Sequence, residues 1–277
     1  MISNPSAQDQ ELHFLAGYSP EDYDRPSLAA DIAAFSLQTE QVAKYRNDPE
    51  QKLCILLIRR GQHPYKDMWA LPGGFLQKSE TLEDCAFREL KEETNLEPEN
   101  MLWVNSYSNP GRDPRGWIIS HAYACISTET QAALAASADA SDAKWFQVHL
   151  SKTEGNSCLL TLSHGDISLN ARLREVESRM GRIRFQVLES QGLAFDHAAI
   201  IGEAMELLRK EAENIETIFA FLPEKITLSA LQKVQETLMG ISLLTPNFRR
   251  KIAGLVEETD EYTEGAGHRP AKLFRKK

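Results

Sequence analysis

The sequence predicts a mixed α/β or α+β domain followed by a small winged helix domain, and three observations support this. Apolar runs of strand-like composition alternate with a few helical patterns over about 200 residues. The final 60 or so residues show a helix, a short turn, a basic helix and a hairpin, in that order. A length of 277 residues also fits two domains, at one domain for roughly every 150 residues.

The first part of the chain divides into an arm and a strand-rich domain. We expect the arm over residues 1–27, where Pro20 and Pro26 mark turns, and the domain over residues 28–213. Its strands are expected at residues 31–37, 52–58, 101–107, 117–126, 144–148, 158–162, 166–169 and 182–188. Its helices are expected at residues 81–94 and 196–214, with a shorter one at 132–136.

The winged helix domain is expected over residues 214–277. Thr227 can cap a helix over residues 228–239, and Gly240 can end it. Thr245 and Pro246 open a second helix that reaches about residue 253. Residues 255–262 and 271–275 can then pair as the two strands of a wing.

Composition narrows the class of protein before any motif is considered. Hydrophobic residues make up 42% of the chain and charged residues 26%, as in folded soluble proteins. The longest apolar run, Leu53–Ile58, is too short to span a bilayer, and Met1–Phe14 lacks the layout of a signal peptide. Four cysteines without paired spacing argue against a disulfide framework or a zinc site. We therefore expect a cytoplasmic protein with no membrane partner.

Charge is distributed unevenly along the chain. The net charge of −9 would by itself argue against a nucleic-acid partner. Residues 227–277, however, hold nine basic and six acidic side chains and so carry +3, which leaves −12 for the rest. This segregation favours DNA binding by the C-terminal domain.

The most informative stretch is a carboxylate-rich helix. Glu89, Glu92 and Glu93 stand at i, i+3 and i+4, so they share one helix face and repel each other unless cations neutralise them. Oxygen ligands of this kind select Mg²⁺ or Mn²⁺. The alternative is a solvated acidic face, which is the usual role of such a charge run.

The surrounding residues resemble the Nudix box, G-x5-E-x7-R-E-U-x-E-E-x-G-U, in which U is aliphatic. Gly74, Glu80, Arg88, Glu89, Leu90, Glu92, Glu93 and Leu96 all fall at its fixed positions. The second glycine of the box is replaced by Asn95, which tolerates the left-handed conformation that ends a helix. We expect this departure to have a small geometric effect.

The resemblance to Nudix proteins implies an α/β/α sandwich with a mixed sheet. It also implies hydrolysis of a nucleoside diphosphate linked to another moiety. Catalysis would involve Glu92, Glu93, Arg88 and Glu80, and the metal would be held by Gly74, Glu89, Glu92 and Glu93. The general base stays open among Glu92, Glu93 and Glu154, the last by its order in the chain only.

Further segments resemble a narrower group, the Nudix proteins with a fused winged helix. This group includes ADP-ribose pyrophosphatases and Nudix-related transcriptional regulators of NAD metabolism. The matching segments are Tyr23–Ser27, Arg59–Phe75, Gly111–Trp117, Leu193–His197, Asn247–Lys251 and Gly267–Phe274. Residues 150–190 match least, which suggests an insertion.

Two functions follow from the resemblance, and both can hold. The first is a Mg²⁺-dependent pyrophosphatase that cleaves ADP-ribose or a related nucleoside diphosphate sugar. The second is a regulator of NAD-related genes that senses ADP-ribose without turnover. Substrate would contact Arg112, Arg115 and Arg59, although the loop that holds Arg112 and Arg115 can equally be a surface turn. We expect His197 to cap or pack a helix and His63 to be a loop residue.

The basic residues of the tail are the candidate DNA contacts. Asn247, Arg249, Arg250 and Lys251 lie on the expected recognition helix, and Arg269 lies in the wing. The alternative is a packing or dimerisation module with a solvated basic face. One winged helix reads only a half-site, so the DNA-binding hypothesis requires a homodimer.

Overall fold

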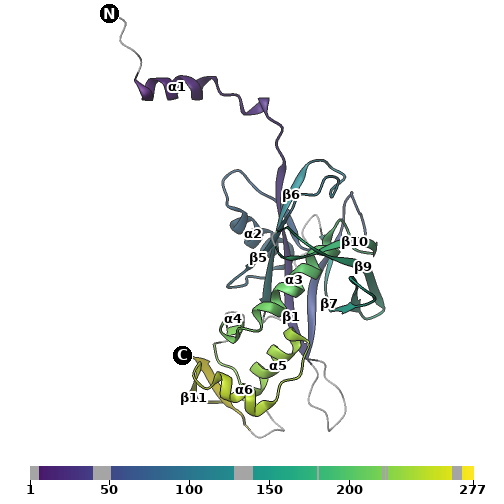
Figure 1. Ribbon diagram of the computed structural model, residues 1–277, viewed down its shortest axis with the longest axis vertical. Coiled ribbons are helices and arrows are strands. Elements are labelled where there is room, and N and C mark those ends of the chain that lie inside the picture. Colours follow the sequence, from purple (N-terminus) through teal and green to yellow (C-terminus); the bar gives the residue numbers. More distant parts are fainter. Residues whose placement is uncertain are drawn as a thin grey trace, which may run out of the picture.

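The computed structural model of the chain (Figure 1) describes residues 6–39, 51–127, 140–179, 181–219, 222, 224–263 and 270–277. The expected helix at residues 132–136 lies outside these ranges. The N-terminal part contains α1 Ala7–Gly17, the 3-10 helix η1 Pro20–Asp22 and the strands β1 Ser27–Thr39, β2 Gln51–Arg60, β3 Trp69–Ala70 and β4 Gly73–Phe75. The middle contains α2 Leu82–Thr94, β5 Leu102–Tyr107, β6 Ile118–Ser127, β7 Ala140–Lys152, β8 Ser157–His164, β9 Ile167–Glu177 and β10 Ile183–Gln191. The C-terminal part contains α3 His197–Glu211, α4 Ile215–Phe219, α5 Leu228–Met239, α6 Thr245–Ile252, β11 Val256–Tyr262 and β12 Lys272–Lys276.

One large mixed sheet organises the first domain. Its strands follow the order β10-β9-β8-β7-β2-β1-β6-β5, with β3 beside β2 and β4 beside β1. The pair β1–β6 is parallel, and the other pairs in the described part of the sheet are antiparallel. The segment at residues 150–190 is therefore not separate from the domain, because β8, β9 and β10 extend the same sheet.

The central strands are apolar on both faces because a helix covers each face. In β1, Ile32 and Ala34 join the core under α2, whereas Ala33 and Phe35 join the core under α3. The same alternation holds in β2. Since neighbouring side chains of a strand point to opposite faces, a continuous apolar run is what two covered faces require. This confirms the predicted α/β sandwich with a mixed sheet.

The helix α2 has strong signals at both ends. Thr81 and Asp84 form a reciprocal capping box at its start. At its end, Asn95 adopts the left-handed conformation with φ 56° and ψ 15°, which the sequence analysis anticipated for the residue that replaces glycine. Cys85, Ala86 and Leu90 are buried against the sheet. This packing fixes the position of the acidic face of α2 relative to β4.

The arm is more ordered than its turn signals indicated. Residues Ala7–Gly17 form α1, which Ser6 and Asp9 start with a second capping box, and no residue of α1 is buried. Figure 1 shows α1 standing away from the sheet, connected through η1 to the first residue of β1. A capping box directly before a run without proline or glycine was the signal that would have predicted this helix.

The C-terminal elements form the predicted winged helix. Thr227 accepts a hydrogen bond from the backbone N–H of Ala230, and Gly240 ends α5 with φ 65°. The strands β11 and β12 pair antiparallel as the wing. Leu231, Leu238 and Phe248 belong to the same hydrophobic cluster as the core under α3, so the two domains share one continuous apolar core.

Two further properties bear on the environment of the protein. The four cysteines are all buried, and none of them forms a disulfide. Among the helices in the described ranges, none is long and apolar enough to cross a membrane.

Candidate functional site: a charged pocket and an exposed basic helix

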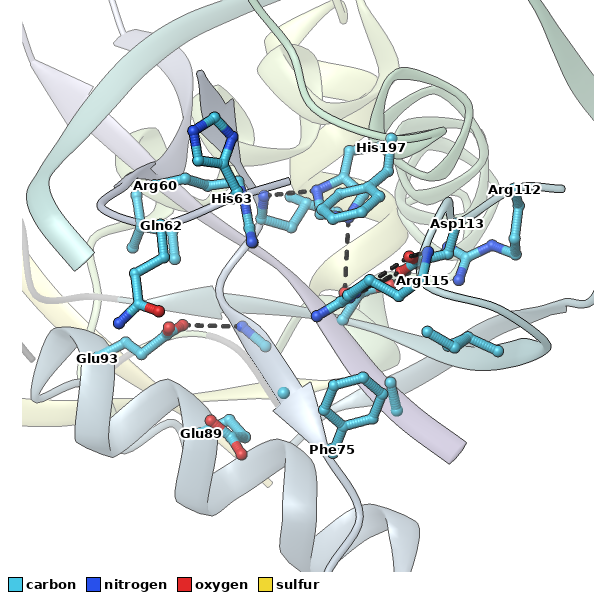
Figure 2. Close-up of a pocket in the computed structure, with 18 residues that line it drawn as sticks. Arg60, Gln62, His63, Phe75, Glu89, Glu93, Arg112, Asp113, Arg115 and His197 are labelled. Atoms are coloured by element: carbon cyan, nitrogen blue, oxygen red, sulfur yellow. Dashed lines mark hydrogen bonds and ion pairs between the residues drawn. The ribbon is translucent and has the colours of Figure 1, made fainter. Parts of the chain in front are cut away.

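A charged pocket of about 370 Å³ lies between the start of α3, the strand β4 and the acidic face of α2. Figure 2 shows carboxylates on its α2 side and arginines on its opposite side. The lining residues are Ala29, Asp31, Ile58, Arg60, Gln62, His63, Leu71, Gly73, Gly74, Phe75, Glu89, Glu93, Arg112, Asp113, Arg115, Ile118, Phe195 and His197. The size falls within the ordinary range of small-molecule sites.

The acidic wall depends on the two glycines of β4. The Glu93 carboxylate accepts a hydrogen bond of 2.9 Å from the backbone N–H of Gly73. A Cβ at Gly74 would lie 2.3 Å from the Glu89 carboxylate, so any larger residue would push this side chain away. Burial raises the pKa of Glu89, an effect that the neighbouring Arg88 partly offsets.

Arg88 is the centre of an ion-pair network beside the pocket. Its Nη2 and Nε atoms lie 2.7 Å and 2.9 Å from the two carboxylate oxygens of Glu80. Its Nη1 atom lies 2.7 Å from Glu89 and 3.2 Å from Glu92. The hydrogen bonds from Arg88 lower the pKa of Glu80 to about 2. Arg88 and Glu80 thus hold Glu89 in place from outside the pocket.

The three carboxylates of α2 that were predicted to hold metal do not all face the pocket. Glu89 and Glu93 line it, whereas Glu92 pairs with Arg88 and its side chain is 58% exposed. In the described ranges, no three His, Cys, Asp or Glu side chains are grouped to hold a metal ion. The carbonyl of Gly74 faces the thiol of Cys85 at 3.9 Å. Glu154 lies in the turn between β7 and β8 and does not line the pocket.

Two of the three predicted substrate arginines line the pocket. Arg112 is buried and makes a bidentate pair with Asp196, at 2.6 Å and 2.9 Å. Arg115 is partly exposed and pairs with the buried Asp113, at 2.7 Å between Nη2 and Oδ2. These side chains come from the loop before β6, so the loop is part of the pocket wall as well as a surface turn.

The third predicted arginine, Arg59, does not line the pocket. It donates to the backbone carbonyl of Asp67 at 3.2 Å and lies 3.5 Å from the Asp67 carboxylate. Its neighbour Arg60 lines the pocket in its place. Consecutive side chains of a strand point to opposite faces of the sheet. Choosing Arg59 instead of the adjacent Arg60 therefore placed the predicted contact on the wrong face.

His197 makes polar contacts at the pocket in addition to packing. Its Nδ1 atom accepts a hydrogen bond of 2.9 Å from the backbone N–H of Leu71, and its Nε2 atom lies 3.7 Å from Asp31. Burial lowers the pKa of His197, so the ring is neutral at pH 7 and carries its proton on Nε2. His197 packs as predicted and also lines the pocket, as does His63.

Phe195 lines the pocket, and no site signal beyond the segment Leu193–His197 pointed to it. Its ring lies 5.0 Å from the guanidinium of Arg60 and 5.4 Å from that of Arg115. Tyr65 meets it edge-on, with ring centroids 4.6 Å apart. Its φ of 51° is unusual for a bulky residue, and such backbone strain is concentrated at functional sites.

The second candidate site is the outer face of α6. Asn247, Arg249 and Arg250 are exposed, and Arg250 donates to the Asn247 side chain at 2.6 Å. Phe248 and Ile252 anchor the helix in the core. Lys251 instead donates to the backbone carbonyl of Glu213 at 3.1 Å, at the junction between the domains. Arg269 lies outside the described residues.

Comparison with known proteins matches one family model to each domain of the chain. The profile of the NUDIX domain matches residues 39–157, and the profile of the NrtR DNA-binding winged helix domain matches residues 218–275. The ADPR responsive transcriptional repressor NtrR of Acinetobacter baylyi is 32% identical over 269 residues, which cover 96% of this chain and 88% of the repressor. The ADP-ribose pyrophosphatase of Methanocaldococcus jannaschii is 43% identical over 95 residues, which cover 34% of this chain and 55% of that enzyme.

Two solved structures are similar over almost their whole length. A MutT/nudix family protein from Enterococcus faecalis has a TM-score of 0.73 at 29% identity, with 99% of this chain and 94% of that chain covered. Shewanella oneidensis NrtR complexed with a 27mer DNA has a TM-score of 0.61 at 28% identity, with 90% and 93% covered. The likeness therefore extends over the sheet domain and the winged helix together.

Proposed function

Because the chain belongs to the family of Nudix proteins that carry an NrtR-type winged helix, we propose that it is a transcriptional regulator whose pocket binds ADP-ribose or a related nucleoside diphosphate sugar. One observation carries the proposal most strongly. A repressor named for its response to ADP-ribose is similar over 96% of the chain, which includes the pocket and α6. We propose the domain border between residues 213 and 214, as the sequence indicated.

The pocket has the chemistry that such a ligand requires. Arg115 offers a guanidinium at the pocket wall, and planar guanidinium groups bind phosphate oxygens in pairs. Phe75 and Phe195 offer aromatic surface on either side of Arg115, at 4.9 Å and 5.4 Å from its guanidinium carbon. A pyrophosphate with a base or a sugar attached needs both kinds of contact.

The outer face of α6 has the chemistry of a DNA contact. Arg249 and Arg250 are exposed on a helix that begins after a short turn, as a recognition helix does. A single winged helix covers one half-site, so the proposal includes a homodimer on operator DNA. We also propose that the protein acts in the cytoplasm.

Ligand binding can be tested by calorimetry with ADP-ribose. Arg115→Gln removes a pocket guanidinium, and we expect its affinity to fall about tenfold, which corresponds to about 1.4 kcal/mol. Arg59→Gln is the matched control, because Arg59 does not line the pocket, and its affinity should stay within twofold of the wild type. Absence of binding by the wild-type protein would reject the ligand, and equal losses in both variants would reject the pocket.

DNA binding can be tested with a duplex that the wild-type protein selects from a random pool. We expect Arg249→Gln with Arg250→Gln to weaken binding by about tenfold or more and to reduce the salt dependence by about 0.9 for each lost phosphate contact. The control is Arg172→Gln with Arg174→Gln on β9, which removes the same charge from an exposed strand of the other domain. A protein that selects no duplex would contradict the proposal.

A second candidate activity is Mg²⁺-dependent hydrolysis of the same ligand. It is favoured by one specific observation, that every acidic position of the Nudix box is filled and that Glu89 and Glu93 face the pocket. These two carboxylates would hold the cation, with Glu92 joining if it leaves Arg88 and with the Gly74 carbonyl nearby. The chemistry that Mg²⁺ or Mn²⁺ supplies in such sites is neutralisation of pyrophosphate charge and activation of water.

Hydrolysis can be tested by incubating the protein with ADP-ribose and Mg²⁺ and separating the products. Turnover should yield AMP and a ribose phosphate, and Glu93→Gln should lower the rate at least about a hundredfold. Glu97→Gln is the matched control, because Glu97 is exposed at the same helix end and pairs with Lys91. If Glu93→Gln cleaves at the wild-type rate, Glu93 has no part in the reaction, and if the wild type cleaves nothing, the protein is a sensor without turnover.

A further inference from the structure

A single helix, α3, connects the pocket to the DNA-binding domain. At its start, His197 lines the pocket and Asp196 pairs with the pocket residue Arg112. At its end, the carbonyls of Ala212 and Glu213 accept hydrogen bonds from Gln235 of α5 at 2.7 Å and from Lys251 of α6 at 3.1 Å. The 15 residues of α3 span about 22 Å. Figure 1 shows α3 lying across the sheet, with α4 at its lower end and α5 below it.

The middle of α3 is held by one buried carboxylate. Glu203 accepts hydrogen bonds from Tyr107 at 2.9 Å and Asn105 at 3.0 Å on β5. On β10 it accepts from the Arg184 side chain at 2.9 Å and the backbone N–H of Phe185 at 3.2 Å. Hydrogen bonds from β5 on one side and β10 on the other hold Glu203 in place. If one end of α3 is displaced, we expect the helix to rotate about Glu203.

At the start of α3, the residue at the capping position is held by another contact. Asp196 occupies the N-cap position, yet its carboxylate caps no backbone N–H and is committed to Arg112. A phosphate in the pocket competes for the guanidinium of Arg112, because charge-assisted bonds to phosphate are as strong as those to a carboxylate. Once released, Asp196 can cap the first turn of α3, because aspartate is among the preferred N-cap residues.

The far end of α3 also has an unsatisfied group. Gln235 is 2% exposed, and its side-chain oxygen has no hydrogen-bond partner although its amide nitrogen bonds to Ala212. An unpaired buried acceptor costs free energy, so an arrangement that supplies it with a donor competes with the one described.

We propose that α3 is a lever, pivoted at Glu203, that couples ligand binding in the pocket to the position of the recognition helix α6. Release of Asp196 from Arg112 moves the start of α3, and Gln235 and Lys251 transmit the movement of its end to α5 and α6. The inference rests on the proposed regulator function and adds its mechanism. It also assigns Lys251 as a positioning residue at the domain junction, in place of the DNA contact that the sequence suggested.

The lever predicts a ratio that can be measured. DNA affinity with saturating ADP-ribose, divided by DNA affinity without it, gives the coupling factor, and linkage requires DNA to change ADP-ribose affinity by the same factor. We expect a factor of about 5 to 150 in the wild type, in either direction. The probes are ADP-ribose and the duplex that the wild-type protein selects.

Lys251→Gln tests the far end of the lever. Lys251 is exposed, so the variant should fold, bind ADP-ribose within twofold of the wild type and show a coupling factor near one. Lys251→Arg keeps a donor of similar length and should restore at least half of the coupling on a logarithmic scale. Arg249→Gln is the control on the same helix, and it should weaken DNA binding equally with and without ADP-ribose.

Asp196→Asn tests the near end. Asparagine caps helices as well as aspartate but cannot pair with Arg112 as an ion. We therefore expect the DNA affinity of this variant without ADP-ribose to match that of the wild type with ADP-ribose.

Several outcomes would overturn the lever. One is a wild type that binds ADP-ribose and DNA with no coupling between them, which leaves the proposed function standing. Another is a Lys251→Gln variant that loses DNA affinity equally in both states, because Lys251 would then be a DNA contact. A protein that binds neither probe would reject the proposed function itself and the lever with it.

Discussion

Glu203 connects three elements in the interior of the first domain. It is a carboxylate buried among β5, β10 and α3, with the Arg184 guanidinium as its charged partner at 2.9 Å. Burial and the nearby Glu203 also raise the pKa of Tyr107 well above its ordinary value. The carboxylate thus satisfies donors that would otherwise be buried without a partner.

Glu203→Gln should therefore destabilise the fold. The variant keeps the shape but loses the ion pair and places an amide N–H among donors, and we expect a loss of about 2 kcal/mol because Arg184 is partly exposed to solvent. Urea unfolding measures the change. Glu206→Gln on the same helix removes the same charge from a more exposed pair with Arg209 and should cost less than about 0.5 kcal/mol. Similar losses in the two variants would show that the buried network contributes nothing special.

His197 makes stability depend on pH. Its folded pKa lies below the ordinary value of 6.5 because burial disfavours the charged ring, more than Asp31 and Asp196 favour it. The unfolded chain therefore binds this proton first as the pH falls, so the contribution of His197 is complete above pH 6.5 and is lost below it.

His197→Asn tests this dependence. Asparagine keeps an acceptor for the backbone N–H of Leu71 but does not titrate. Melting temperatures across the range below pH 6.5 should fall less steeply in the variant than in the wild type. An unchanged slope would assign the acid sensitivity to other groups.

At the level of single residues, the sequence predicted the types of residue near the pocket better than the directions in which their side chains point. The fixed spacing of the Nudix box located Glu89 and Glu93, because helical periodicity determines which residues share a face. It did not separate them from Glu92, whose pairing with Arg88 depends on a rotamer. Lys251 shows the same limit, since a basic residue on a basic helix bonds to Glu213, 38 positions earlier in the chain.

Among the elements, α3 packs closely against the sheet at a glycine in its middle. A Cβ at Gly202 would lie 2.9 Å from the ring of Phe185 and 3.2 Å from the side chain of Leu173. Glycine is a poor helix residue, so its presence in the middle of α3 reflects this close approach. The close packing of α3 on β9 and β10 therefore depends on the absence of a side chain at Gly202.

Gly202→Ala should lower stability although alanine favours helices. The clash costs about 1 to 3 kcal/mol, which exceeds the gain of about 1 kcal/mol in helix propensity. Gly254→Ala is the matched control, because no atom lies within 4 Å of its added Cβ and its φ is not positive. Chemical denaturation should show a loss for the first variant and little change for the second. A stabilised Gly202→Ala protein would mean that Phe185 moves aside freely.

Long elements with clear capping residues at their ends could be predicted from the sequence. Short strands that depend on pairing with another strand could not. The helix α2 has a capping box and an Asn95 terminus, and its predicted range needed almost no correction. The two- and three-residue strands β3 and β4 exist only because β2 and β1 pair with them. The extension of the sheet through β8, β9 and β10 likewise depends on contacts between strands, which local composition does not reveal.

In the molecule as a whole, the two domains share a core that crosses their border. Phe248 and Ile252 of α6 belong to the cluster that contains Ile201 and Leu208 of α3. In the described part of the winged helix, these buried apolar side chains therefore belong to a core that continues into the first domain. The bonds of Gln235 and Lys251 bridge the border as well.

The two domains should accordingly unfold in one transition. All four tryptophans, Trp69, Trp103, Trp117 and Trp145, precede the winged helix, so tryptophan fluorescence reports the first domain alone. Far-ultraviolet circular dichroism reports the helices of both domains. We expect the two signals to have the same urea midpoint. A dichroism transition that separates from the fluorescence transition would show a winged helix that is stable independently.

The buried cysteines provide a further means of observing motion. Burial raises the pKa of Cys54 to about 11 and those of Cys85 and Cys125 to about 12, so at neutral pH these thiols are protonated and poorly reactive. They belong to three different elements, β2, α2 and β6. A thiol reagent can modify each one only when its element opens. Labelling rates would therefore measure the opening of these strands and of α2 without any engineered probe. The winged helix would contribute no signal, because it contains no cysteine.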